Sequence, residues 1–218
     1  MGLGAVVKEA VARVAPRAFV VRGPAGIARQ VALTFDDGPH PEHTPRILDA
    51  LDMHGVKGTF FVQGDMAERH PAILRETVRR GHQIGNHGYS HQNVRARGGS
   101  AYVADVLRTQ QVVENTTGCA QPKFFRPPYG SITLPTTLAL LHHGFRFIFW
   151  TLDSRDSFVP DAATMLAYLD AQRIEPGCIV LMHDDYRHTA EALGDLVVSI
   201  RRRDLAPVSV AALVGHAL

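Results

Sequence analysis

Apolar and polar positions follow two patterns along the chain: short apolar runs, and longer segments that carry an apolar stripe. The short runs are rich in β-branched and aromatic residues, which is typical of buried strands. Seven strands are predicted, at Val31–Phe35, Gly58–Val62, Gln83–Gly85, Lys123–Phe125, Phe147–Thr151, Cys178–Met182 and Ala206–Ser209. Strands that alternate with helices form parallel sheets, which are either closed into a barrel or open and doubly wound.

Helical periodicity is predicted between these strands. Thr44 is expected to cap a helix that has Pro45 at its first position, and Ser100 is expected to cap another. A helix that begins at Pro71 is expected to end at Gly81, because glycine readily adopts the left-handed conformation that ends helices. The other predicted segments are Leu134–His143, Ala162–Arg173, Thr189–Arg203 and a terminal turn at Val210–Leu213.

The loop after the first predicted strand decides between the two sheet types. A sheet that binds a nucleotide usually has a glycine-rich loop at this position. Here the chain reads Thr34-Phe35-Asp36-Asp37-Gly38-Pro39, which places carboxylates where a phosphate cradle needs backbone amides. A barrel is therefore favoured. Residues 1–30 are expected to add an amphipathic helix and an extended lead-in packed outside it.

Composition and charge narrow the possible functions. The 218 residues are 45% hydrophobic and 20% charged, which suits one globular domain. A net charge of +2, without a basic stripe, gives no support for nucleic-acid binding. No run approaches the roughly 18 apolar residues of a membrane span. The sequence makes no prediction of the oligomeric state.

The charged N-terminus and the cysteines give two further expectations. Lys8 and Glu9 interrupt the region where a secretory signal needs an apolar run. The protein is therefore expected to be cytoplasmic, or secreted if a leader has been removed. Cys119 and Cys178 fit no metal or redox spacing, and both are expected to be buried as small apolar residues.

Polar clusters follow five of the predicted strands, where barrel enzymes place their catalytic groups. The clusters are Asp36-Asp37, Asn86-His87-Gly88-Tyr89-Ser90-His91, Arg126-Pro127-Pro128-Tyr129, Asp153-Ser154-Arg155-Asp156 and Leu181-Met182-His183-Asp184. If the strands are parallel, all five lie on one rim. Two imidazoles and a carboxylate can bind a divalent metal and leave positions open for water and substrate. The other clusters contain candidates for the base, acid and oxyanion stabiliser of a hydrolase.

Each cluster also has a purely structural explanation. Asp-Gly and Gly-Pro are common turn sequences. One helical turn would bring His87 and His91 to the same side without any ligand. Arg126-Pro127-Pro128-Tyr129 could be only a rigid loop, with Arg126 paired to a surface acid. Asp153 and Asp156 could cap the next helix, and His183 could be a hydrogen-bonded structural histidine. Five such coincidences on one rim are less expected than one functional site.

In this order the clusters resemble the polysaccharide deacetylases, also called the NodB-homology domain or carbohydrate esterase family four. The resemblance extends from about Val31 to Leu213. It is carried by Thr34-Phe35-Asp36-Asp37-Gly38, by His87-x-x-x-His91, by Arg126-Pro127-Pro128-Tyr129 and by Leu181-Met182-His183. It implies a distorted (β/α) barrel, similar to a TIM barrel and commonly seven-stranded, with a catalytic domain over residues 31–218.

The resemblance implies a metal site and a substrate pocket. Asp37, His87 and His91 would bind a divalent metal, most often zinc and sometimes cobalt or another ion. The backbone N–H of Tyr129 would help to stabilise the oxyanion. Leu181 would line the pocket for the acetyl methyl group. Pro128 and Tyr129 would lie beside the substrate.

The resemblance also implies an acid–base pair. Asp36 would be the general base that takes a proton from water, and Arg126 would hold it. His183 would be the general acid for the leaving amine, with Asp156 as its carboxylate partner. Opposite neighbours would then keep the base ionised and the acid protonated.

Two positions depart from the family pattern. The family usually has Ser or Thr after the first histidine of the pair, where this chain has Gly88. Trp often follows the carboxylate partner of the acid, where this chain has Ser157. A hydroxyl hydrogen bond and one wall of the sugar groove are therefore expected to be missing.

The sequence thus predicts a metal-dependent hydrolase that removes N-acetyl, or else O-acetyl, groups from a carbohydrate. Chitooligosaccharide, peptidoglycan and other N-acetylglucosamine-containing glycans are all candidate substrates. One alternative keeps the scaffold and cleaves another amide, as a deformylase or a non-sugar amidase. A second alternative is a non-catalytic metal-binding or glycan-binding protein.

Overall fold

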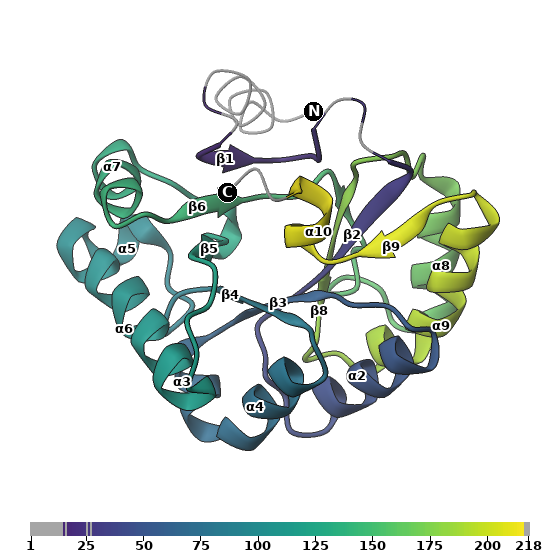
Figure 1. Cartoon of the computed structure of the whole chain (residues 1–218), viewed down its shortest axis with the longest axis horizontal. Helices are drawn as coiled ribbons and strands as arrows, with labels where there is room; N and C mark the ends of the chain where they lie inside the picture. The colour runs from purple at the N-terminus through teal and green to yellow at the C-terminus, as the bar shows by residue number, and fades with distance from the viewer. Residues whose placement is uncertain (1–14, 16, 25, 27, 216–218) are drawn as a thin grey trace.

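Parallel strands curl into an incomplete barrel with helices on its outer face (Figure 1). The computed structural model describes residues 15, 17–24, 26 and 28–215, so the helix expected near the N-terminus lies outside the described residues. The strands are β1 (Phe19–Val20), β2 (Gln30–Asp36), β3 (Thr59–Val62), β4 (Gln83–Asn86), β5 (Phe124–Phe125), β6 (Arg146–Ile148), β7 (Leu152–Asp153), β8 (Ile179–His183) and β9 (Ala206–Val208).

Helices follow most strands and cover the sheet. The larger ones are α2 (His43–Met53), α4 (Pro71–Arg79), α6 (Gly99–Thr117), α7 (Leu134–His142), α8 (Ala162–Ala171) and α9 (Arg187–Arg202). The shorter ones are α3 (Gly64–Arg69), α5 (Val94–Arg97), the 3₁₀ turn η1 (Pro128–Gly130) and α10 (Val210–Val214). The described residues contain no helix that is both long enough and apolar enough to cross a bilayer.

The strand order is β1-β6-β5-β4-β3-β2-β8-β7, with β9 beside the start of β2, and every pairing is parallel. The distorted α/β barrel is therefore confirmed, but the described chain has nine strands where seven were predicted. The two additional strands, β1 and β7, have two residues each, which is too short to produce a pattern. β1 pairs with β6, so the lead-in joins the sheet instead of packing outside it.

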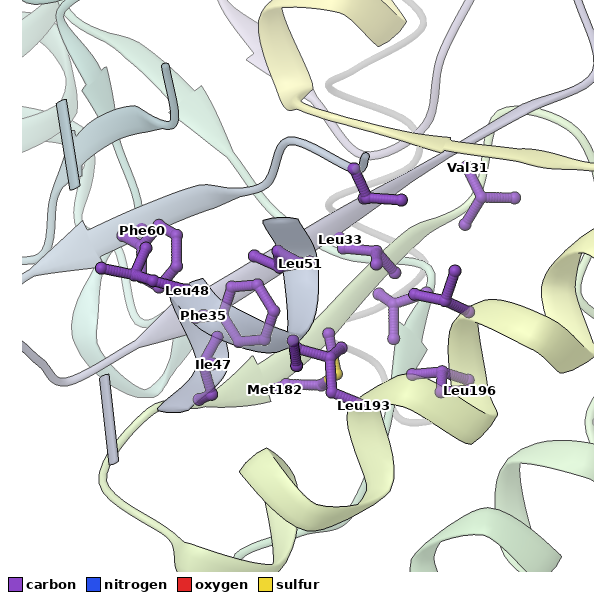
Figure 2. Close-up of a cluster of buried hydrophobic side chains, with 14 of the residues drawn as sticks. Val31, Leu33, Phe35, Ile47, Leu48, Leu51, Phe60, Met182, Leu193 and Leu196 are labelled. Atoms are coloured by element: carbon purple, nitrogen blue, oxygen red, sulfur yellow. The ribbon is translucent and has the colours of Figure 1, made fainter. Parts of the chain in front are cut away.

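Period-two alternation on the central strands separates the inside of the barrel from the helix-covered outside. Val31, Leu33 and Phe35 of β2 pack in the large core beneath α2 and α9, as Figure 2 shows. The intervening residue Ala32 belongs to a separate cluster with Phe61. The same alternation places Thr34 and Asp36 on the inner face of the barrel. One strand therefore supplies both the core and the site.

The chain between β6 and β7 closes the barrel wall. The predicted strand Phe147–Thr151 is too long, because β6 ends at Ile148. Phe149 N–H still donates to the Val20 carbonyl, at 2.7 Å, beside β6. Two residues later, Thr151 N–H donates to the Ile179 carbonyl of β8, at 3.0 Å. The segment thus crosses from one side of the gap to the other.

Helix α10 closes the end of the barrel opposite the predicted rim, and it confirms the expected terminal turn. Val210 and Leu213 pack in the inner cluster. Val210 N–H donates to Thr59 Oγ1 at 2.9 Å, and Ala211 N–H donates to Gln83 Oε1 at 3.0 Å. Helix α10 therefore leaves the opposite end, at the carboxyl ends of the strands, uncovered.

Two of the predicted helix caps are wrong. α2 begins at His43, so Thr44 lies inside its first turn, and the Thr44 hydroxyl donates to Asp184 Oδ2. α6 begins at Gly99, one residue before Ser100, because Gly98 precedes it with a φ of 82°. Gly81 follows α4 with a φ of 79°, as predicted.

The two cysteines also differ from each other. Cys178 is buried as expected, but Cys119 is exposed in the turn after α6. Neither forms a disulfide.

His82 gives the fold a testable pH dependence. Its side chain is buried, and its Nδ1 accepts a hydrogen bond from the Gly58 N–H at 3.2 Å. Burial, with the nearby Lys57, lowers the pKa of His82 from 6.5 to about 4. The unfolded chain therefore takes up this proton first as the pH falls. Stability is fully present above about pH 6.5 and is lost as the pH falls towards 4, by at most about 3 kcal/mol.

His82→Asn isolates this contribution, because the Asn carbonyl oxygen still accepts from Gly58 but does not titrate. Urea unfolding between about pH 7 and pH 4 should show a smaller loss of stability in the variant than in the wild type. Parallel pH curves for the two proteins would contradict the prediction.

Candidate active site

All five polar clusters lie at the carboxyl ends of parallel strands and contact one another, as the one-rim hypothesis predicts. Asp36 ends β2, and Arg126 follows β5. Their side chains meet at 2.7 Å between Arg126 Nη1 and Asp36 Oδ1. His183 ends β8 and lies 4.0 Å from Asp37, measured from Nε2 to Oδ2. Residues about 150 positions apart in the sequence therefore share one site.

Asp37, His87 and His91 form the group that can hold a metal ion. Asp37 Oδ1 lies 3.5 Å from His87 Nε2 and 3.3 Å from His91 Nε2. One ligand atom from each of the three residues lies within 4.8 Å of the other two. Neutral imidazole nitrogens and a carboxylate oxygen are a donor set that zinc prefers.

The hydrogen bonds around this group also suit a metal. His87 Nδ1 lies 2.7 Å from the Arg126 carbonyl, which can only accept, so Nδ1 carries the proton. The lone pair of Nε2 is then free to bind a cation, which is the usual arrangement of a metal-ligating histidine. Gln63 Nε2 donates to Asp37 Oδ1 at 2.8 Å and helps to orient that carboxylate. The residues present therefore fit a divalent metal.

The charges within the group act on its titration. Burial raises the pKa of Asp37, but the three imidazoles around it and the Gln63 hydrogen bond outweigh burial and lower the pKa. Burial lowers the pKa of His91 more than the neighbouring carboxylates raise it. An ionised carboxylate and a neutral imidazole are the forms that bind a metal.

Left-handed backbone brings these ligands together. Asp37 has a φ of 79° and His91 a φ of 50°, and Gly88 between the histidines has a φ of 80°. The expectation that His87 and His91 share one helical turn is therefore wrong, because the segment is a loop. At Gly88 the missing hydroxyl has a physical reason, since this backbone conformation strongly favours glycine.

Arg126 holds Asp36 from inside the barrel. Its guanidinium is completely buried and stacks on the Phe61 ring, 4.1 Å from the ring centre. It donates to Asp36 Oδ1 at 2.7 Å and to Thr34 Oγ1 at 2.8 Å, and it also reaches the Ile148 and Phe149 carbonyls at 3.2 Å. The arginine therefore orients the carboxylate and compensates its charge.

His183 and Asp156 form the second predicted pair. The ring nitrogen His183 Nδ1 lies 2.7 Å from Asp156 Oδ1. The other oxygen, Asp156 Oδ2, accepts from the backbone N–H of His183 and from the Thr189 hydroxyl. Burial alone would lower the pKa of His183. The carboxylates of Asp156, Asp36 and Asp37 outweigh burial and raise the pKa from 6.5 to about 10. His183 therefore carries a proton at neutral pH.

The structure places the predicted substrate-side residues at the same rim. Tyr129 is 67% exposed, has a φ of 58°, and places its ring 4.8 Å from the His91 ring. Pro128 and Leu181 are both buried, Pro128 next to Tyr129 in η1 and Leu181 on β8, two residues before His183. At the second departure, Ser157 N–H donates to Asp156 Oδ1 at 3.0 Å.

Sequence reasoning missed Gln63 and Asp105, and it named Asp184 in the last polar cluster without giving it a role. Gln63 directly follows β3, so the strand-end rule could have found it. Asp184 is buried against Gly38, where any Cβ would collide with its carboxylate. Burial raises the pKa of Asp184 to about 7 and that of Asp185 to about 6. Asp105 of α6 carried no signal in the sequence, because it reaches the histidine loop only through the fold.

The structural interpretation of Asp153 and Asp156 as helix caps is wrong. Asp161 caps α8 and accepts from the Thr164 N–H at 2.8 Å. Asp153 Oδ1 accepts from the Arg155 N–H within its own loop, at 2.8 Å. Asp156 is therefore left for His183.

A family model described as polysaccharide deacetylase matches residues 24–148, more than half of the chain. The chain belongs to the polysaccharide deacetylase family. The match includes Asp36, Asp37, the two histidines and Arg126. His183 lies beyond it and is assigned to the site by its contacts.

Two curated members of the polysaccharide deacetylase family illustrate the relationship. A peptidoglycan-N-acetylglucosamine deacetylase of Bacillus cereus is 39% identical over 76% of this chain, but the match spans only 59% of that protein. A chitooligosaccharide deacetylase of a Bradyrhizobium species is 34% identical over 85% of this chain and 92% of its own length.

A solved structure extends the family likeness to the whole fold. A crystal structure of a peptidoglycan N-acetylglucosamine deacetylase superposes with a TM-score of 0.85 at 32% identity. The superposition covers 93% of this chain and 95% of that chain. It therefore includes most of the residues that lie beyond the family-model match.

The buried ion pair makes a prediction about stability. Arg126→Met removes the cation and leaves the Asp36 carboxylate buried without a partner. We therefore expect the free energy of unfolding to fall by about 3–5 kcal/mol. Arg126→Met combined with Asp36→Asn removes both charges and should recover part of that loss. Urea unfolding of the three proteins measures both effects. A double variant no more stable than the single variant would show that the unpaired charge is not the cause.

Proposed function

We propose that the chain is a metal-dependent deacetylase that hydrolyses the N-acetyl groups of N-acetylglucosamine-containing glycans. The observation that carries the proposal is one rim where a three-residue metal site adjoins two ion pairs of opposite character. Arg126 holds the Asp36 carboxylate in place as the candidate base, and Asp156 raises the pKa of His183, the candidate acid. The relatives' activities on peptidoglycan and on chitooligosaccharide suggest the substrate class.

Asp37, His87 and His91 would hold the metal. A bound divalent cation would polarise the substrate carbonyl and lower the pKa of water in the site towards neutral pH. Asp36 takes a proton from the attacking water, and Arg126 keeps the carboxylate facing the site. The Tyr129 N–H donates to the carbonyl oxygen as negative charge develops there.

His183 completes the reaction on the opposite side of the scissile bond. With Nδ1 held by Asp156, its Nε2–H is the proton that can pass to the nitrogen of the leaving amine. The carbon–nitrogen bond breaks, and acetate and a free amine result. Leu181 and Pro128 provide an apolar wall for the acetyl methyl group, so the pocket favours a small acyl group.

The first test combines metal content with acetate release. The purified protein is assayed on chitooligosaccharides and on peptidoglycan fragments, before and after treatment with a chelator. We expect the chelator to abolish acetate release and zinc or cobalt to restore it. His91→Ala should lose the metal, while the matched control His142→Ala, an exposed histidine on α7, should keep both metal and activity.

Other outcomes of this test discriminate between the alternatives. Bound metal without acetate release from either glycan would contradict the proposed substrate and favour another amide, such as a formamide. A protein that binds the metal and the glycan without cleaving it would be a binding protein. Absence of metal binding would contradict the mechanism.

A second test separates the base from the acid. Asp36→Asn and His183→Ala should both retain the metal and lose about 10²–10⁴-fold in amide hydrolysis. An aryl acetate releases a phenolate that needs no proton, so His183→Ala should be far less impaired on this ester than on the amide. Asp36→Asn should be impaired on both substrates, because water attacks in either case. Equal losses of the two variants on both substrates would contradict the assignment.

A further inference from the structure

The loop that carries His91 is held mainly through its backbone. The His91 ring contacts groups of the site itself, namely Asp37 at 3.3 Å and the rings of His87 and Tyr129. His87 is different, because its Nδ1 is anchored to the Arg126 carbonyl. The position of His91 therefore depends on what holds residues 88–90.

The carbonyls of this loop are held by the start of α3. Gly64 N–H donates to the Gly88 carbonyl at 2.9 Å, and Asp65 N–H donates to the Tyr89 carbonyl at 3.1 Å. The approach is so close that a Cβ at Gly64 would lie 2.5 Å from the Tyr89 ring. One side of the loop is therefore held by two hydrogen bonds from the start of α3.

Asp105 of α6 holds the other side. Its Oδ2 accepts from the Tyr89 N–H at 2.7 Å, and its Oδ1 accepts from the Ser90 hydroxyl at 3.1 Å. Arg97 Nη2 forms an ion pair with the same Oδ1 at 3.1 Å, and Arg97 Nη1 donates to the Ser90 hydroxyl at 3.3 Å. The Asp105 side chain is 3% exposed, so its charge is placed inside the protein and compensated there.

Asp105 on α6 accepts two hydrogen bonds from a single loop, and the packing of the helix against that loop does not by itself require them. A buried carboxylate is costly unless it is paired and hydrogen-bonded, and every bond described here ends on the loop or on Arg97. The next residue along α6, Val106, extends the same contact, because its carbonyl accepts from Asn86 Nδ2 at 2.8 Å. Asn86 Oδ1 in turn accepts from the Gly88 N–H at 2.9 Å.

We propose that Asp105 is a positioning residue that sets the place of His91 and thereby the affinity of the metal site. The inference rests on the proposed function, because it assumes that His91 binds the metal. Among the described residues, the Asp105 carboxylate bonds to the Tyr89 N–H, the Ser90 hydroxyl and Arg97 rather than to the candidate ligands, and it acts on His91 through the first two. Partners behind the ligands typically contribute about 10–100-fold to metal affinity.

Zinc binding by purified variants tests the proposal without any substrate. Asp105→Ala should weaken Zn²⁺ binding about 10–100-fold in a competition titration with a chelating dye. Gln110→Ala is the matched control: it is buried on the same helix and bonds to Glu114 and Gln121 rather than to the loop. The control should bind zinc like the wild type, even if its unfolding midpoint falls as far as that of Asp105→Ala.

Two further readouts separate positioning from a general loss of structure. Asp105→Glu keeps the carboxylate and should restore part of the zinc affinity. With Co²⁺ in place of zinc, the visible absorption of Asp105→Ala should shift away from that of the wild type, because a displaced His91 changes the set of cobalt ligands, whereas the absorption of Gln110→Ala should match the wild type. If Asp105→Ala does not fold, Asp105→Asn provides the same comparison with less disruption.

The outcomes distinguish this inference from the proposed function. Wild-type zinc affinity in Asp105→Ala, together with lost affinity in His91→Ala, would overturn the role of Asp105 and leave the metal site intact. An equal loss of affinity in Asp105→Ala and Gln110→Ala would reduce Asp105 to a structural residue. A wild-type protein that binds no zinc would contradict the proposed function, and with it this inference.

Discussion

A completely buried arginine inside the barrel is the constraint on which the rest of the structure depends. A guanidinium cannot lose its proton, so the interior must supply acceptors for it. Arg126 finds them in Thr34 and Asp36 on one strand and in the Ile148 and Phe149 carbonyls across the barrel. The side chain that orients the candidate base therefore also ties the central strand to the segment that closes the wall.

The alternation of residue types was sufficient to predict most of the fold. On β2, apolar residues at 31, 33 and 35 face the helices, and the small or polar residues between them face inward, so the pattern is strong. β1 and β7 are too short to show one, and they exist because neighbouring strands pair with them. Thr44 was misjudged for a similar reason, since its hydroxyl bonds Asp184, which is 140 positions away in the sequence.

The site was predictable where chemistry coincides with strand ends. Asp36, Arg126 and His183 were found because each lies at or directly after the carboxyl end of a parallel strand. The spacing of the histidines points to one shared site, but the helical explanation of that spacing is wrong, because the left-handed Gly88 turns the loop. Asp105 could not be found at all. It lies within a helix and reaches the site only because that helix packs beside the loop.

Left-handed backbone has a consequence for how such a chain can change over time. In the described part of the chain, five residues other than glycine have a positive φ, and Asp37, His91 and Tyr129 are three of them. For L-residues this conformation costs about 1 kcal/mol or more at each position, and glycine would relieve it. Glycine there would also delete a candidate metal ligand or the Tyr129 ring beside it. At these positions, selection for stability therefore opposes selection for catalytic activity. A descendant that has lost its activity can be the more stable protein.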